Sequence, residues 1–66
     1  MKISDIQKKL KTSFKNGFYF SRPALIENDV VLYITKTGTA FQFQNNQCFK
    51  IEFMNWENEI DDWIIL

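Results

Sequence analysis

The stretch that decides the fold is VVLYITKTGTAFQFQNNQCFKIEF, residues 30–53. Its first six residues, 30–35, are mostly β-branched or aromatic, which is typical of a strand. Phe41 and Phe43 then alternate with glutamines, and the apolar residues of 48–53 alternate with polar ones. A period of two indicates a half-buried antiparallel strand. The stretch therefore predicts three consecutive strands.

The first turn of this stretch fixes which residues face each other. A three-residue loop over 36–38, with its glycine in the left-handed conformation, places Tyr33 opposite Phe41 and Val31 opposite Phe43. The remaining residues of the first strand point to the other side of the sheet, and they are apolar as well. We therefore expect a helix to cover one face of this strand and a terminal segment or a second subunit to cover the other.

The second turn allows two registers. A two-residue loop at Asn45 and Asn46 would set the two phenylalanines of the preceding strand opposite Lys50 and Cys48. An odd-length loop over 45–47 keeps the aromatic residues together instead. We expect the odd-length loop.

An amphipathic helix is predicted over residues 4–15. Ser4 and Gln7 have the spacing of a capping box, and Gly17 can take the left-handed conformation that ends a helix. Lysines fill the positions between the apolar residues of one helical face. That face consists of Ile3, Ile6, Leu10 and Phe14.

The segment after this helix predicts a further strand. Residues 18–22 are rich in strand formers, and Pro23 ends the run. Because proline is confined to sheet edges, this strand is expected to be an edge strand. Residues 24–29 are expected to form a loop.

The C-terminal segment combines two patterns. Trp56, Ile60 and Trp63 have helical spacing, whereas the last four residues are typical of a strand. We expect one helical turn capped by Asn55, and then a short strand from Asp62 onward. The fold class is thus α+β: an N-terminal amphipathic helix packed on an antiparallel meander of about four to five short strands, with a short helical turn before the last strand.

Length and composition support a single folded domain over residues 1–66. The chain has a mass of 7.9 kDa, and a protein of this size hides only about 60% of its unfolded surface. Hydrophobic residues make up 45% of the chain and aromatic residues 17%, which is enough to form a small core. Self-association would help to complete that core.

Residue counts exclude several chemistries. The chain has no histidine, and Cys48 is its only cysteine. This excludes a disulfide framework, zinc sites built on Cys and His, and every histidine-based catalytic pair. Neither of the two glycines belongs to a phosphate-cradling loop. We therefore expect no metal, no cofactor and no enzymatic activity.

The formal net charge of zero conceals a division along the chain. Residues 1–22 carry +5, whereas residues 23–66 carry −5. A zero total argues against a general nucleic-acid binder and against an acidic mimic. The lysines could simply be a solvated helix face. The alternative interpretation is functional: the basic helix and Arg22 attract a phosphate-bearing ligand to one side of the fold.

The aromatic residues supply flat surfaces for such a ligand, although most of them must serve as core in so small a chain. Arg22 could contact a phosphate with two hydrogen bonds. Trp56 lies among polar residues. Its sequence context is equally consistent with a ring that stacks on a base and with a ring that packs in the core. The aromatic residues able to stack a base are Phe18, Tyr19, Phe20, Tyr33 and Trp56.

Both ends of the chain resemble a small phage family that includes Thoeris anti-defence sponge proteins. The helix over 6–14, the strand from Gly17 to Arg22, Trp56 and the closing motif IDDWII at 60–65 are similar to that family's elements. The resemblance implies a non-enzymatic protein that sequesters a cyclic nucleotide or a cyclic ADP-ribose-like immune signal in pockets at subunit interfaces. The family's second tryptophan after the arginine is missing here, which removes one stacking surface.

The resemblance carries Arg22 and Trp56 over as ligand contacts, and we add Tyr19 and Asp62 as candidates. The expected partners are a small anionic nucleotide-like ligand and further copies of the chain. In the alternative, the protein is a small inhibitor or adaptor that binds a host protein through its acidic C-terminal turn or a sheet edge. Nucleic acid is a weaker option. No segment is typical of a signal peptide or long enough to span a membrane, so we expect a cytoplasmic protein.

Overall fold

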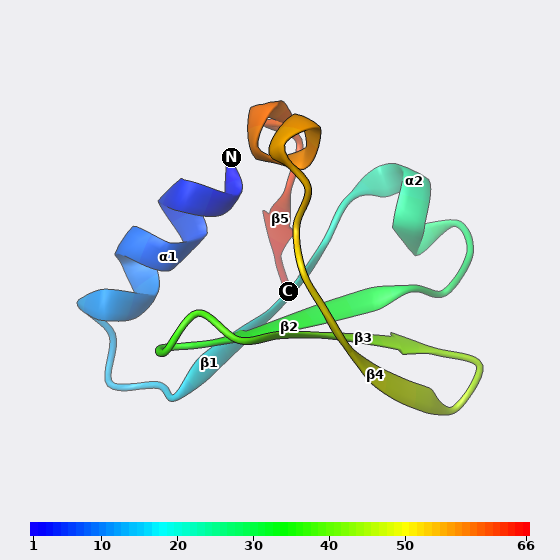
Figure 1. The fold of residues 1–66 in the computed structure, drawn as a ribbon, viewed down its shortest axis with the longest axis horizontal. Helices are drawn as coiled ribbons and strands as arrows, with labels where there is room; N and C mark the ends of the chain where they lie inside the picture. Colours follow the sequence, from blue (N-terminus) through cyan, green and yellow to red (C-terminus); the bar gives the residue numbers. More distant parts are fainter.

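One amphipathic helix packs against a five-stranded antiparallel sheet in the computed structural model, which describes all of residues 1–66 (Figure 1). The strands lie in the order β4-β3-β2-β1-β5. This arrangement confirms the predicted α+β fold. In chain order the elements are α1 (Ile3–Lys11), β1 (Gly17–Ser21), α2 (Pro23–Ile26), β2 (Val31–Thr35), β3 (Ala40–Gln44), β4 (Gln47–Ile51), the 3-10 helix η1 (Asn55–Glu59) and β5 (Ile64–Ile65).

Helix α1 buries the apolar face that its periodicity predicts, because Ile3, Ile6 and Leu10 are all buried. Its boundaries differ from the prediction. The backbone N–H of Lys2 donates to the carboxylate of Asp5 at 3.0 Å, so the cap forms here and not between Ser4 and Gln7. The helix also ends at Lys11 and not at residue 15.

Two hydroxyl residues explain the early end of α1. Thr12 Oγ1 donates to the carbonyl of Lys9, and Lys15 N–H donates to Ser13 Oγ, so these side chains compete with helical hydrogen bonds. Phe14 follows them and is fully exposed. Its predicted place on the buried face of the helix is therefore wrong.

Strand β1 occupies the interior of the sheet, so the predicted edge strand is wrong. It pairs with β2 on one side and with β5 on the other. Leu66 N–H adds a hydrogen bond to the carbonyl of Tyr19 at 2.9 Å. Pro23 does not prevent this pairing, because it lies beyond the strand and begins the short helix α2, where a loop was predicted.

Gly17 does not end α1 in a left-handed conformation, which corrects the sequence prediction. It is the first residue of β1, and the positive-φ glycine of the chain is Gly38. A Cβ atom at Gly17 would collide with the ring of Tyr33 and with the carbonyl oxygen of Ile34. Glycine is needed here because β2 lies too close to leave room for a side chain, and not because the backbone turns.

The first hairpin follows the predicted register. Val31 faces Phe43 and Tyr33 faces Phe41, and Gly38 has a φ of 89° in the intervening turn. This part of the prediction is confirmed. It succeeded because a left-handed glycine at this point of the loop leaves only one register for the flanking strands.

The second hairpin contradicts the predicted odd-length loop. Asn45 and Asn46 have φ values of 51° and 62°, and Gln44 pairs directly with Gln47 across a two-residue turn. Asparagine tolerates this left-handed backbone, which such a turn requires at both positions. Phe41 and Phe43 consequently face Lys50 and Cys48.

The C-terminal segment contains the single predicted helical turn, with shifted bounds. Met54, and not Asn55, precedes η1, and its N–H donates to the Glu57 carboxylate at 3.0 Å. The last strand is shorter than predicted and does not begin at Asp62. The chain between η1 and β5 buries Trp63 against Phe20, with ring centroids 5.3 Å apart.

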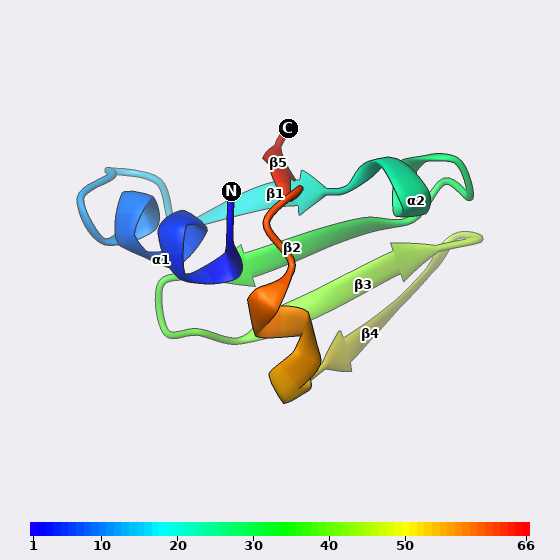
Figure 2. The same cartoon turned by 90° about the horizontal axis from the view of Figure 1, so that it is seen from above.

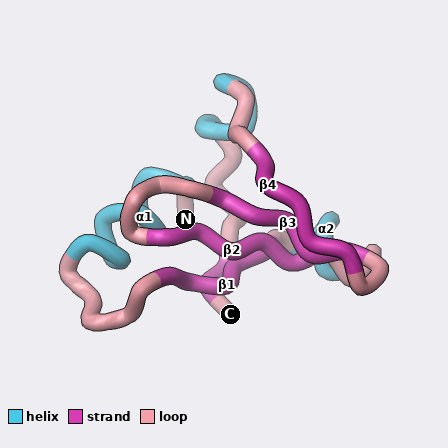
Figure 3. Tube along the Cα trace, turned by 60° about the horizontal axis from the view of Figure 1, so that its bottom comes forward, coloured by secondary structure: helices cyan, strands magenta, loops and turns pink.

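Only one side of the sheet is covered. Helix α1, η1 and the chain that leads to β5 all lie over this side, which we call the covered face (Figures 1 and 2). The opposite side, seen from another direction in Figure 3, carries no further element and is called the open face. The predicted second cover is therefore not provided by the terminal segment. The covered face supplies Phe20, Leu32, Ile34 and Ala40, and the open face presents Tyr19, Val31, Tyr33, Phe41 and Phe43.

Candidate functional site

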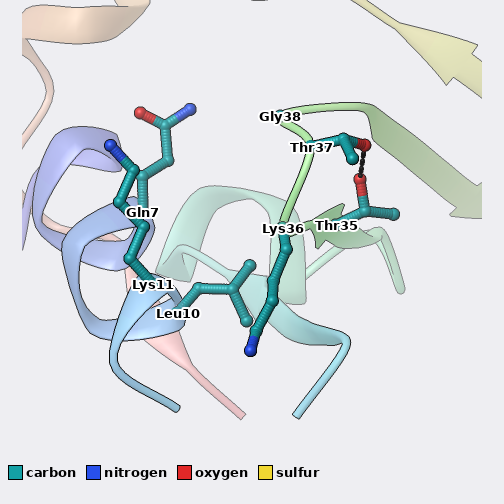
Figure 4. A pocket seen from close by; sticks show the side chains of 7 residues that line it. All are labelled: Gln7, Leu10, Lys11, Thr35, Lys36, Thr37 and Gly38. Carbon is teal, nitrogen blue, oxygen red and sulfur yellow. Dashed lines mark hydrogen bonds between the residues drawn. The ribbon is translucent and has the colours of Figure 1, made fainter. Parts of the chain in front are cut away.

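A polar cleft lies between α1 and the turn that joins β2 to β3 (Figure 4). Its volume is about 190 Å³, and Leu10 is the one hydrophobic residue in its lining. The cleft brings together segments that are about 25 residues apart in the sequence. Its walls are formed by Gln7, Leu10 and Lys11 from α1 and by Thr35, Lys36, Thr37 and Gly38 from the end of β2 and the turn.

Buried and backbone contacts hold the two walls in place. Leu10 is buried in the core and fixes α1 against the sheet. Lys36 N–H donates to the Asn16 carbonyl at 3.1 Å, and Lys36 Nζ donates to the Ser13 carbonyl at 2.5 Å. These hydrogen bonds connect the turn to the segment that follows α1. They therefore fix the position of one wall of the cleft relative to the other.

The lining of the cleft is rich in hydrogen-bond donors. Gln7 and Lys11 extend side by side from α1, opposite the side chains of Thr35 and Thr37, whose hydroxyls lie 2.9 Å apart (Figure 4). Lys11 takes part in neither of the two salt bridges of the chain, so its ammonium remains free. Lys36 uses one of its three donors on Ser13, which leaves two for a ligand.

The electrostatic balance of the cleft favours an anion. No acidic side chain lines it, whereas two lysines do. The C-terminal end of α1 contributes a negative partial charge of about half an electron. Lys8, Lys9 and Lys11 lie in the last turn of the same helix and outweigh this charge. A small anion would therefore find a positive potential here.

Phe14 is an exposed aromatic residue in the segment that follows α1. It follows Ser13, whose carbonyl accepts the hydrogen bond from Lys36. The ring is fully exposed, although a phenylalanine gains free energy from burial. Sequence periodicity assigned this residue to the core and so missed its position. The adjacent Thr12 and Ser13 are the signal that could have revealed it, since both favour the end of a helix.

Arg22 and Asp62, two of the residues predicted for the site, bind each other. Arg22 Nε donates to Asp62 Oδ1 at 2.7 Å, and Nη2 donates to Oδ2 at 3.1 Å. This hydrogen bonding lowers the pKa of Asp62 and raises that of Arg22. The guanidinium carbon also lies 5.8 Å from the ring centroid of Trp63. In this structure the donors of Arg22 that face Asp62 are occupied.

The other two predicted residues lie elsewhere. Tyr19 is 52% exposed on the open face, where its ring packs 4.7 Å from that of Tyr33. Trp56 is 63% exposed on η1 and belongs to none of the aromatic pairs of the chain. The structure thus brings Arg22 and Asp62 together, but it does not gather all four residues at one site.

No family model, curated protein or solved structure matches this chain. None of its helices has the length and the apolar character that crossing a membrane requires. No group of three or more Cys, Asp or Glu side chains is arranged to hold a metal ion. The features that bear on function are the polar cleft, the Arg22 to Asp62 pair, the open face and the exposed Trp56.

Proposed function

We propose that this protein binds a small phosphate-bearing ligand of the nucleotide type and does not transform it. The observation that carries the proposal is a cleft that Lys11 and Lys36 line and no carboxylate lines, in which Lys11 has no salt-bridge partner. Charge-assisted hydrogen bonds to phosphate oxygens are strong, and lysine is a common phosphate ligand. The amide of Gln7 and the hydroxyl of Thr37 add neutral donors.

The size of the cleft indicates how such a ligand would lie. Pockets that enclose a whole drug-sized molecule have volumes of about 300–1,000 Å³, and this cleft has about 190 Å³. A phosphate and part of a sugar fit this space, whereas a base would remain outside. For the base we propose stacking on Phe14, which is exposed and directly follows Ser13, the residue whose carbonyl accepts the hydrogen bond from Lys36.

The resemblance of the chain ends to the Thoeris anti-defence sponge family gives this ligand a candidate identity. It would be a cyclic nucleotide or a cyclic ADP-ribose-like signal, and the role of the protein would be to sequester it inside a bacterial cell. Arg22 could contribute only by releasing Asp62, because both sides of that pair are engaged with each other. The lysines of the cleft need no such exchange.

The proposal is tested by thermal unfolding in the presence of cyclic nucleotides and ADP-ribose. A ligand at about 100 times its dissociation constant stabilises the folded state by about 2.7 kcal/mol, which raises the melting temperature of so small a domain by roughly 10 °C or more. We expect Lys11→Gln to reduce affinity at least tenfold. Lys8→Gln is the matched control, because Lys8 lies on α1 but outside the cleft.

Two outcomes would contradict this function. The first is that no member of the panel shifts the melting temperature of the wild-type protein at millimolar concentration. The second is that Lys8→Gln weakens binding as much as Lys11→Gln does, because the effect would then follow the overall charge of α1 and not the cleft.

A second candidate function is supported by a different surface. Met54 and Trp56 are both 63% exposed at η1, among the acidic residues Glu57 and Glu59. Exposed tryptophan is frequent at the centre of protein interfaces. A small inhibitor or adaptor that binds a host protein would use this turn. Recovery of a bacterial protein by the wild type and not by Trp56→Ser would support it, and equal recovery by both would count against it.

A further inference from the structure

A second hollow lies at the end of the sheet where β3 turns into β4, and the phosphate-binding function does not use it. Its volume is about 590 Å³, which makes it larger than the polar cleft, and the two share no residue. Small-molecule sites usually have volumes of about 300–1,000 Å³. The hollow therefore has the size of a ligand site.

The floor of the hollow is apolar and is built from three neighbouring strands. Val31 of β2 pairs with Phe43 of β3, and Phe43 pairs with Cys48 of β4, so the three side chains form a row on the open face. Val31 and Phe43 are both partly buried. The ring of Tyr19 lies 6.0 Å from that of Phe43 and supports it from the side.

The rim of the hollow holds every non-glycine residue of the chain that has a positive φ. These are Asp29, Asn45 and Asn46, with φ values of 56°, 51° and 62°. Glycine adopts this backbone at the lowest cost, yet each position carries a polar side chain. No side-chain hydrogen bond or salt bridge of the structure involves these three side chains. The rim therefore has two amides and one carboxylate that are free to bind a ligand.

We propose that this hollow binds one ring of a neutral sugar. A sugar hydroxyl both donates and accepts hydrogen bonds, an amide side chain does the same, and a carboxylate accepts. The C–H groups of the ring would lie on Val31 and Phe43, where their contact removes apolar surface from water. Hydroxyls at the edge of the ring would then face the polar rim.

The lining of the hollow disfavours the other classes of small ligand. No lysine or arginine lines it, and Asp29 would repel a phosphate. A calcium ion takes six to eight oxygen ligands, whereas the hollow has a single carboxylate. A nucleobase needs a flat surface on which to stack. The rings of Tyr19 and Phe43 are tilted by 53° and form no common plane, whereas a puckered sugar ring needs none.

The proposal is tested by an amide NMR titration of the wild-type protein with glucose, galactose, mannose and N-acetylglucosamine. A single sugar ring has few atoms, so we expect a dissociation constant in the millimolar range. At least one of the four sugars should cause saturable shifts at Asn45, Asn46 and Cys48. Thr37 and Gly38, which line the polar cleft, should not shift.

Asn46→Gly separates the side chain from the backbone. Asn-Gly is the preferred pair for a two-residue turn of this kind, so the variant keeps the hairpin and loses only the amide. We expect its affinity for the sugar to fall about fivefold, as for the loss of one hydrogen bond. Asn58→Gly is the matched control, because Asn58 is exposed on η1 and does not line the hollow.

Three results would overturn the proposal. The first is that none of the four sugars causes saturable shifts around the hollow, and the second is that Asn46→Gly binds as tightly as Asn58→Gly. The third is an equal response to sorbitol, which has the hydroxyls of a sugar but no ring, or a response to adenosine alone. Because none of the four sugars carries a phosphate, these results leave the phosphate-binding function to its own test.

Discussion

At the scale of single residues, the pairing of Arg22 with Asp62 joins the end of β1 to the chain that enters β5. Two hydrogen bonds connect the side chains, although both are partly exposed. They lower the pKa of Asp62 below its ordinary value, because the hydrogen bond from Arg22 stabilises the carboxylate. Stability and pH are therefore linked at this residue.

The sign of this linkage gives a prediction. A carboxyl group with a lowered folded-state pKa stabilises the protein above the ordinary aspartate value of about 3.9 and loses that contribution as pH falls through the lowered pKa. Urea unfolding should show the wild type more stable than Asp62→Asn at neutral pH, with the difference shrinking in acid. Asp61→Asn is the control, since Asp61 makes no ion pair. A difference independent of pH would contradict this account.

Gly17 offers a second prediction at this scale. A methyl group there would collide with the Tyr33 ring and with the backbone of Ile34. Gly17→Ala should therefore cost about 1–3 kcal/mol of unfolding free energy, as overpacking does. Repeating the substitution in a Tyr33→Ala background should reduce the cost without removing it, because the Ile34 carbonyl remains. Equal costs in the two backgrounds would show that the Tyr33 ring does not press on this position.

At the scale of elements, the length of α1 decides the fate of two residues, Ile6 and Phe14, that the sequence periodicity places on the same buried face. Ile6 is fully buried, whereas Phe14 lies beyond the end of the helix and is fully exposed. Ile6→Ala should destabilise the fold by about 2–5 kcal/mol, which approaches the whole stability of so small a core. Phe14→Ala should change it by less than about 0.5 kcal/mol. Denaturant unfolding measures both changes. A large loss of unfolding free energy in Phe14→Ala would contradict the exposed position of Phe14 and support a helix that extends to this residue.

The strands show what local sequence can and cannot predict. The register of β2 with β3 was predictable because Gly38 and the alternation of apolar residues act over a few positions. The register of β3 with β4 was not predicted, because aromatic side chains on the open face do not have to face one another: Phe41 pairs with Lys50 and Phe43 with Cys48. The interior position of β1 depends on β5, which lies about 40 residues away and leaves no local signal.

The candidate site was predictable only in part, for the same physical reason. The lysines of the helix and their attraction for an anion are visible in the sequence. The cleft is not, because its two walls, α1 and the β2 to β3 turn, come together only in the folded chain. Arg22 and Asp62 were both selected as ligand contacts, and the structure shows that they bind each other.

At the scale of the whole molecule, the division of charge along the chain becomes a division in space. Lys8, Lys9 and Lys11 lie together in the last turn of α1, and Glu57 and Glu59 lie on η1. One salt bridge, from Lys2 to Glu59 at 3.8 Å, connects the two regions. Exposed pairs of this kind contribute little to stability. The division leaves a formally neutral protein with lysines concentrated at one end of α1.

The central claim is that the cleft between α1 and the β2 to β3 turn binds a phosphate-bearing nucleotide. The most direct measurement is an amide NMR titration of the wild-type protein with ADP-ribose and cyclic nucleotides. We predict saturable shifts at Lys11, Thr37 and Gly38 that are absent in a Lys11→Gln, Lys36→Gln double variant with an otherwise unchanged spectrum. The absence of saturable shifts with every nucleotide, or shifts confined to residues outside the cleft, would contradict the claim.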